Sequence, residues 1–181
     1  MLKVTYIPGP GDVVGTYQYW TQGLEDPRIP VLTYSSMMYT AISKLKAALQ
    51  VITTYEPPEV KDDWITFSQI SVTSTKKNYF LAQFERVKNI RKNLDAFRPD
   101  IVIVGSDIPV IFLFLLRSKH WRLCLSIHNT YWNIGRRPYF DFKSKIKYYI
   151  TRSNIRITDG ALCTSIACAK QYKSMQINDV P

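Results

Sequence analysis

Ile101-Val102-Ile103-Val104-Gly105-Ser106-Asp107 is an apolar run that ends in a polar tip, and the chain repeats this pattern in three other places. The other apolar runs are residues 2–7, 123–127 and 161–163, each followed by turn-forming or polar residues. Continuous apolar runs rich in β-branched residues are typical of parallel strands buried on both faces. Because ligands bind beyond the carboxyl ends of such strands, the tips predict where a site lies.

Predicted strands alternate with predicted helices along the chain. The clearest helix is residues 78–97, where apolar side chains recur every three or four positions. This alternation predicts an α/β fold, with a Rossmann-like, doubly wound parallel sheet in a single domain. The expected strands are residues 2–7, 51–55, 65–72, 101–104, 123–127 and 161–164, and the expected helices are residues 37–49, 78–97, 108–116, 143–151 and 166–173.

Polar residues in front of three of these helices are expected to act as N-caps. They are Ser35 or Ser36 for the first helix, Asp107 for residues 108–116 and Ser165 for the last helix. Residues 9–34 are expected to form a long polar and aromatic connection without a helix of its own.

The charge of the chain favours anionic partners. Its 181 residues carry a net charge of +10, with 24 Lys and Arg against 14 Asp and Glu. Phosphate groups, nucleic acid and acidic membrane surfaces all suit such a balance, and so does a merely solvated basic surface. The three cysteines show no metal-ligand spacing, so no metal site is expected and the thiols are expected to be free in a reducing, cytoplasmic compartment.

The N-terminus reads as a core strand, because no cationic segment precedes a long apolar run of the kind found in signal peptides. The most apolar stretch, residues 108–116, is shorter than the roughly 20 residues that a membrane span needs. It is expected to be a buried helix.

The glycine loop after the first strand does not match a dinucleotide-binding fingerprint. Gly9, Gly11 and Gly15 give a GxGxxxG spacing where GxGxxG is needed, and no helix is expected to begin at the loop. Glu56 follows the second strand, where a ribose-binding acid lies in such folds. A nucleotide-binding Rossmann-type module therefore remains an alternative.

Four elements, in order, resemble the N-terminal domain of family 4 glycosyltransferases, and together they span nearly the whole chain. They are the glycine loop, the entry to the 101–104 strand (Arg98-Pro99-Asp100-Ile101-Val102), the exit Ser126-Ile127-His128-Asn129, and the run from Thr158 to Ser165. The segment Gly15-Thr16-Tyr17-Gln18-Tyr19-Trp20 departs from the family, in which a Gly-Gly pair opens the first helix directly.

The resemblance implies one half of a two-domain GT-B enzyme. The N-terminal domain of such an enzyme mainly binds the acceptor, and a C-terminal domain binds the nucleotide-sugar through an E-x7-E type motif. That motif is absent from this chain. We therefore expect residues 1–181 to be the acceptor-side domain, with the donor-binding domain supplied elsewhere in a longer protein or by a separate chain.

The implied reaction is carbohydrate biosynthesis: retaining transfer of a hexose from a UDP- or GDP-sugar to a hydroxyl of a glycan or a lipid-linked acceptor. It needs no metal and no cofactor beyond the sugar donor. The resemblance implies His128 as the catalytic residue, and His128 alternatively only satisfies a loop carbonyl. His120, at the amino end of its strand, is expected to be structural. The expected acceptor-side residues are Gly11, Asp12, Gly15, Thr16, Ser106, Asp107, Asn129, Tyr131, Trp132 and Ser165.

Residues 136–156 are strongly basic, with seven Lys and Arg and only Asp141 as an acid. Ile146, Tyr149 and Ile150 share one face of the helix expected there, with lysines around it. Such a helix suits an anionic bilayer surface, which would place the protein at the inner face of the plasma membrane, or it packs on the sheet with a solvated basic face. A nucleic-acid-binding protein is a further alternative, but no nucleic-acid motif accompanies the basic stretch.

Overall fold

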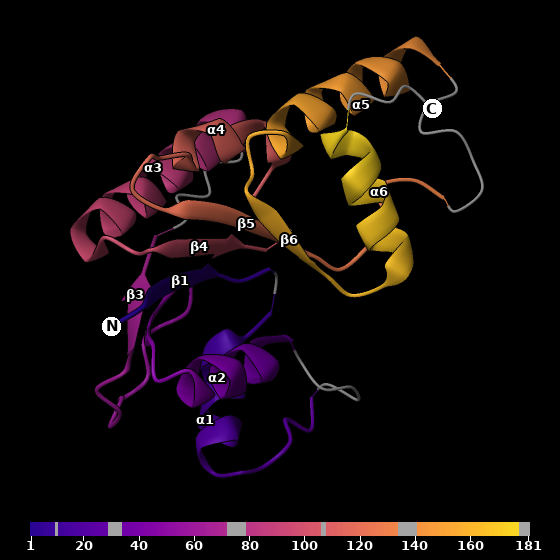
Figure 1. Cartoon of the computed structure of the whole chain (residues 1–181). Coiled ribbons are helices and arrows are strands. Elements are labelled where there is room, and N and C mark those ends of the chain that lie inside the picture. Colours follow the sequence, from indigo (N-terminus) through magenta and orange to yellow (C-terminus); the bar gives the residue numbers. More distant parts are fainter. Residues whose placement is uncertain (10, 29–33, 72–78, 106–107, 134–140, 178–181) are drawn as a thin grey trace.

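A single all-parallel sheet of six strands forms the centre of the molecule in the computed structural model (Figure 1). The structure describes residues 1–9, 11–28, 34–71, 79–105, 108–133 and 141–177. The strand order is β3-β2-β1-β4-β5-β6. Strands β2 and β3 therefore lie on one side of β1, and β4 to β6 lie on the other side, so the strand order reverses between β1 and β4. The strands are β1 Lys3–Ile7, β2 Ala48–Thr53, β3 Ile65–Gln69, β4 Ile101–Val104, β5 Arg122–Ile127 and β6 Gly160–Cys163.

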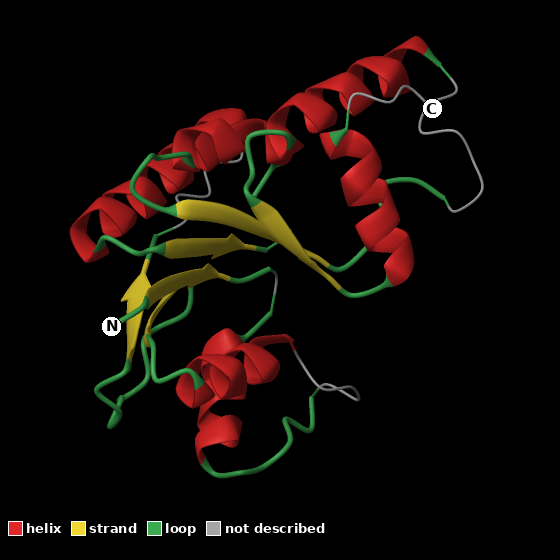
Figure 2. Cartoon of the chain, viewed as in Figure 1, coloured by secondary structure: helices red, strands yellow, loops and turns green. Residues whose placement is uncertain are grey.

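Helices cover both faces of the sheet, as Figure 2 shows. Helices α1 and α2 lie on one face, and α3 to α6 lie on the other. The predicted α/β, Rossmann-like doubly wound sheet is therefore confirmed. The helices are α1 Val13–Thr21, α2 Tyr34–Lys44, α3 Tyr79–Phe97, the 3-10 turn η1 Val110–Phe112, α4 Leu113–Leu116, α5 Phe142–Ile155 and α6 Ile166–Gln176.

Two apolar cores, one on each side of the sheet, hold these layers together. On one side α1 and α2 bury Val13, Tyr17 and Tyr39 against β1 and β2. On the other side α3 buries Ile90 and Leu94 against the centre of the sheet, in a larger cluster that also takes in α5 and α6. Burial of these apolar side chains is the main source of helix stability, because helix propensity alone leaves short helices only marginally stable.

Helix α1 corrects the expectation that residues 9–34 contain no helix. It begins at Val13, directly after the glycine loop, and Asp12 is its N-cap. Gly15 in its first turn and the aromatic residues after it weaken the helical pattern in the sequence, because glycine and aromatic residues are poor helix formers.

Both ends of α2 differ from the expected helix over residues 37–49. Ser35 and Ser36 lie inside the helix, which begins at Tyr34, so neither is its N-cap. The helix ends at Lys44, and Lys46 has a φ of 50°. Residues 48–50 therefore belong to β2, where Leu49 pairs with Val4 of β1. Strand pairing and burial of Leu49 outweigh the helical spacing of the sequence.

The other elements lie close to their predicted positions. Ser165 caps α6 as expected, by accepting a hydrogen bond from the Cys168 amide. The buried helix expected over residues 108–116 is a 3-10 turn followed by the short α4. The cap expected of Asp107 falls outside the described residues. Within the described part of the chain, no helix has the length and apolar character to cross a membrane.

Candidate functional site

The carboxyl ends of four adjacent strands meet at one edge of the sheet, which we call the carboxyl edge. Gly9 follows β1, Gly105 follows β4, His128 follows β5 and Thr164 follows β6. Adjacent strands lie about 4.8 Å apart, so the β1 and β5 tips are about 10 Å from one another. The tips of β1 and β4 flank the point where the strand order reverses, which is where ligands bind in open parallel sheets.

Gly105 brings the β4 tip against the loop that follows β1. Its amide donates to the Ile7 carbonyl at 2.7 Å. A Cβ atom at Gly105 would lie 2.7 Å from the Pro8 carbonyl carbon and nearer still to the Gly9 nitrogen, and both are backbone atoms that cannot rotate away. The close approach therefore requires glycine at this position.

His128 is half-buried at the tip of β5. Its Nε2 lies 3.0 Å from Ser126 Oγ, and its carbonyl accepts a hydrogen bond from Thr164 Oγ1 at 3.0 Å. The Tyr34 ring, at the start of α2, meets the imidazole edge-on with ring centroids 4.0 Å apart. Burial lowers the pKa of His128, so the ring is neutral near pH 7 and can both donate and accept a hydrogen bond.

Some of the residues that follow His128 are exposed to solvent, and one packs against the core. Asn129 is exposed, and Tyr131 remains partly exposed while burial raises its pKa to about 12. Trp132 packs against Tyr148 of α5, with ring centroids 5.8 Å apart, and belongs to the edge of the larger core. Gln171 of α6 holds this segment, because its side chain bonds the Tyr131 amide at 2.7 Å and the Trp132 carbonyl at 2.8 Å.

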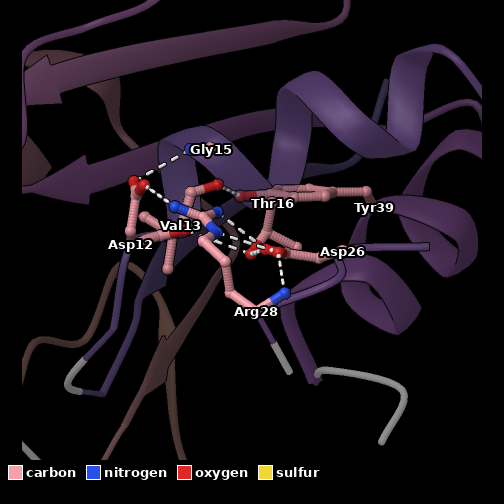
Figure 3. A network of polar contacts seen from close by, with 7 residues as sticks. All are labelled: Asp12, Val13, Gly15, Thr16, Asp26, Arg28 and Tyr39. Atoms are coloured by element: carbon pink, nitrogen blue, oxygen red, sulfur yellow. Dashed lines mark hydrogen bonds and ion pairs between the residues drawn. The ribbon is translucent and has the colours of Figure 1, made fainter. Parts of the chain in front are cut away.

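The glycine loop ends in a polar network around the start of α1 (Figure 3). Gly11 has a φ of 134°, a conformation that favours glycine. Asp12 Oδ1 accepts from the Gly15 amide at 2.8 Å and so caps the helix. Thr16 Oγ1 lies 3.0 Å from both the Asp12 carbonyl oxygen and Asp26 Oδ2, and its single proton can be donated to either.

Arg28 closes this network from outside. Its guanidinium pairs with Asp12 and with Asp26, at 2.7 Å from Asp26 Oδ2 (Figure 3). The guanidinium and the Asp12 carboxylate occupy the space that a Cβ at Gly15 would fill. The glycine at position 15 is therefore explained by an internal ion pair.

The network also sets the charge state of its two carboxyl groups. Hydrogen bonds from the Arg28 side chain are the main reason that the pKa of Asp26 is lowered to about 2, although burial opposes them. Burial alone would raise the pKa of Asp12, but the Gly15 amide and Arg28 outweigh it and lower that pKa. Both groups are ionised at neutral pH, so two negative charges stand against one guanidinium.

This arrangement determines what the start of α1 can bind. In dinucleotide-binding folds the N-terminus of the first helix receives a pyrophosphate. Here the Asp12 carboxylate already takes the Gly15 amide, and its charge repels an incoming phosphate.

We expect Arg28→Ala to lower the melting temperature by about 5 °C at pH 7, because Asp26 then remains ionised in a buried position. The folded-state pKa of Asp26 lies below its ordinary value, so its stabilisation is present above about pH 4 and is lost as the pH falls toward 2. Thermal melts at both ends of this range should therefore show the difference between variant and wild type shrinking in acid. Arg122→Ala is the matched control, because its ion pair with Asp159 is exposed and worth little.

The structure gathers the predicted site residues into two groups. Gly11, Asp12, Gly15 and Thr16 lie around the start of α1, and His128, Asn129, Tyr131 and Ser165 lie at the β5 and β6 tips. Ser106 and Asp107 fall outside the described residues. Sequence reasoning missed Asp26, Arg28, Tyr34 and Gln171, which come from connections or helices with no motif around them, although Asp26 and Arg28 carry the opposite charges of a local pair.

A cavity of about 420 Å³ lies at the opposite, amino edge of the sheet. It is open and lined by the side chains around His120, including Arg117, Lys119 and Arg122. The carboxylates of Asp100 and Asp159 in its wall accept hydrogen bonds from the Lys3 and Leu123 amides, and so serve the sheet. In the described part of the chain no cluster of three or more His, Cys, Asp or Glu residues is placed to hold a metal.

No model of a known protein family matches the sequence, and no curated protein matches it. The function is therefore inferred from the residues and from the geometry of the carboxyl edge.

Proposed function

We propose that this chain is the acceptor-side domain of a GT-B glycosyltransferase that resembles family 4. The enzyme would transfer a hexose from a UDP- or GDP-sugar to a hydroxyl acceptor with retention of configuration. The observation that carries the proposal is His128, a neutral and half-buried imidazole at the tip of β5, which has a parallel strand on each side. It stands at the edge where parallel sheets bind their ligands.

The groups around His128 suit a sugar better than a charged ligand. A neutral imidazole can bond a sugar hydroxyl as donor or acceptor, and the exposed Asn129 amide can do the same. The rings of Tyr34 and Tyr131 retain exposed surface near this tip, and aromatic rings pack well against sugar rings.

The proposal divides the substrates between two domains. This chain supplies the acceptor wall, with His128 directed toward the sugar, and the donor-binding domain supplies the contacts to the nucleotide. Rate in such an enzyme depends on holding both reactants together, so residues 1–181 alone should transfer no sugar. Since nucleotide-sugars are made in the cytoplasm, the enzyme would work there, and at the inner face of the plasma membrane if its acceptor is lipid-linked.

A nucleotide-binding module is the second candidate, and one observation favours it. Helix α1 begins directly after the glycine loop, as nucleotide-binding folds require. Against it stands the Asp12 carboxylate, which takes the amide that a phosphate would use. Glu56, the expected ribose ligand, follows β2 in an exposed loop. Binding of nucleic acid has less support, because the basic helix α5 also carries an exposed apolar ridge.

Titration calorimetry of residues 1–181 with UDP, GDP and their hexose conjugates tests the proposal. We expect dissociation constants weaker than about 1 mM, because the nucleotide contacts belong to the other domain. The far- and near-ultraviolet circular dichroism of the same sample establishes that the chain is folded. Micromolar binding of a free nucleotide would contradict the acceptor-side assignment and support the nucleotide-binding module.

A further inference from the structure

Helix α5 carries an apolar ridge that faces away from the core. Phe142 is 79% exposed, and Ile146, Tyr149 and Ile150 are each more than 40% exposed. A helix that only packs on a sheet buries its apolar residues and exposes polar ones. This helix therefore has an apolar surface that its contacts within the described chain do not explain.

The ridge and the buried face of α5 are separate surfaces. Tyr148, Arg152 and Ile155 are the buried residues of the helix. With 3.6 residues per turn, the ridge centres about 140° around the helix axis from that buried face. Figure 1 shows the first turns of α5 extending past the strands, while its far end lies beside α4. The ridge thus lies on a side of α5 that the core does not cover.

Lysines flank the ridge on both sides. At 100° per residue, Lys143 and Lys147 fall on one side of it and Lys145 on the other. All three side chains belong to exposed residues. No acidic residue occurs from Phe142 to Ile155, and Asp141 is engaged as the N-cap through Ser144. Among the described residues, this surface combines apolar and positively charged side chains, which suits a partner that is both apolar and negative.

We propose that α5 docks this protein on an anionic lipid bilayer. The ridge of Phe142, Ile146, Tyr149 and Ile150 inserts at the boundary between headgroups and acyl chains, and the flanking lysines lie among the lipid phosphates. Nucleic acid would satisfy the lysines but would leave three aliphatic or phenyl side chains in water. Docking requires neither a nucleotide nor a sugar, so it stands apart from glycosyl transfer.

Arg136 and Arg137, which the sequence places in the same basic stretch, lie outside the described residues. The lysines and the apolar ridge make different demands on the partner, so they can be tested separately. Removing lysines should weaken attraction to any polyanion, whereas removing the ridge should weaken only insertion into lipid.

The test is flotation of residues 1–181 with phosphatidylcholine vesicles that contain about a third phosphatidylglycerol, compared with pure phosphatidylcholine. We expect binding to the anionic vesicles only, and we expect it to fall with added salt. Lys143→Gln with Lys147→Gln should weaken binding about 25-fold, since each lysine near such a surface contributes about fivefold. Phe142→Ser with Ile146→Ser should weaken it at least about tenfold.

The matched controls lie on α3. Lys92→Gln and Leu81→Ser make the same kinds of change at exposed positions outside α5, and both should leave vesicle binding unchanged. Heparin binding separates the partners, because the Phe142 and Ile146 pair of changes should not affect it. The proposal is overturned if neutral vesicles bind equally well, if no vesicle binds, or if the ridge variants float like the wild type.

Discussion

Gly105→Ala should destabilise the protein by about 3 kcal/mol in urea unfolding. The new Cβ would meet the backbone of Pro8 and Gly9, and neither can move without shifting the loop that follows β1. Overpacking against side chains typically costs about 1–3 kcal/mol, and backbone atoms adapt less, so the upper part of that range is expected. The change should also shift the start of α1 away from the β4 tip.

Gly160→Ala is the control for this prediction. A Cβ at Gly160 would meet only Cys124 Sγ at 3.6 Å, which is ordinary van der Waals contact. Gly105 directly follows β4 and Gly160 is the first residue of β6 in the same sheet, so their substitutions differ mainly in how closely backbone atoms approach the new Cβ. If the two variants unfold at the same urea concentration with the same slope, the close packing of the β1 and β4 tips is wrong.

The sheet could be predicted from the sequence because its strands are buried on both faces. Such strands are apolar at every position, as Val102, Ile103 and Val104 are, and the short length and β-branched residues of the run favour a strand over a buried helix. Helix α3 was predictable for a related reason. Its apolar residues recur every three or four positions, and those on this stripe, such as Val87, Ile90 and Leu94, are buried.

Helix α1 could not be predicted because its stability is tertiary. Its buried residues include Gly15 and Thr16, which are poor helix formers, and its start depends on the cap from Asp12. Tyr39 of α2 further fixes it by donating to the Val13 carbonyl at 2.9 Å. None of these contacts produces a pattern of apolar residues at helical spacing that could be recognised in the sequence.

The candidate site was predictable only where a strand places it. His128 follows a strand whose direction is fixed by its parallel neighbours, so its edge of the sheet could be inferred. Arg28 lies in an irregular connection and acts on Asp12, which is 16 positions away. Tyr34 likewise reaches His128 only because α2 packs beside α1.

His128→Ala should lower sugar transfer about a hundredfold in a two-domain enzyme that contains this chain. The neutral imidazole is proposed to bond a hydroxyl of the reacting sugars, and loss of one positioned hydrogen bond in an active site typically costs about 100- to 1,000-fold in rate. Affinity for the nucleotide should remain nearly unchanged, because His128 is assigned to the sugar. The same neutral ring predicts slower transfer in mild acid, as the imidazole becomes protonated.

His120→Ala is the matched control, since His120 is the other histidine of the chain and lies at the amino edge. The central claim is tested most directly by initial rates of hexose transfer from a UDP- or GDP-sugar, measured for the wild type and both variants. We predict that His128→Ala loses about a hundredfold in kcat with the donor's dissociation constant unchanged, while His120→Ala matches the wild type. Equal rates for all three proteins, or a loss in His128→Ala that appears only as weaker nucleotide binding, would contradict the assignment of the carboxyl edge to the sugar.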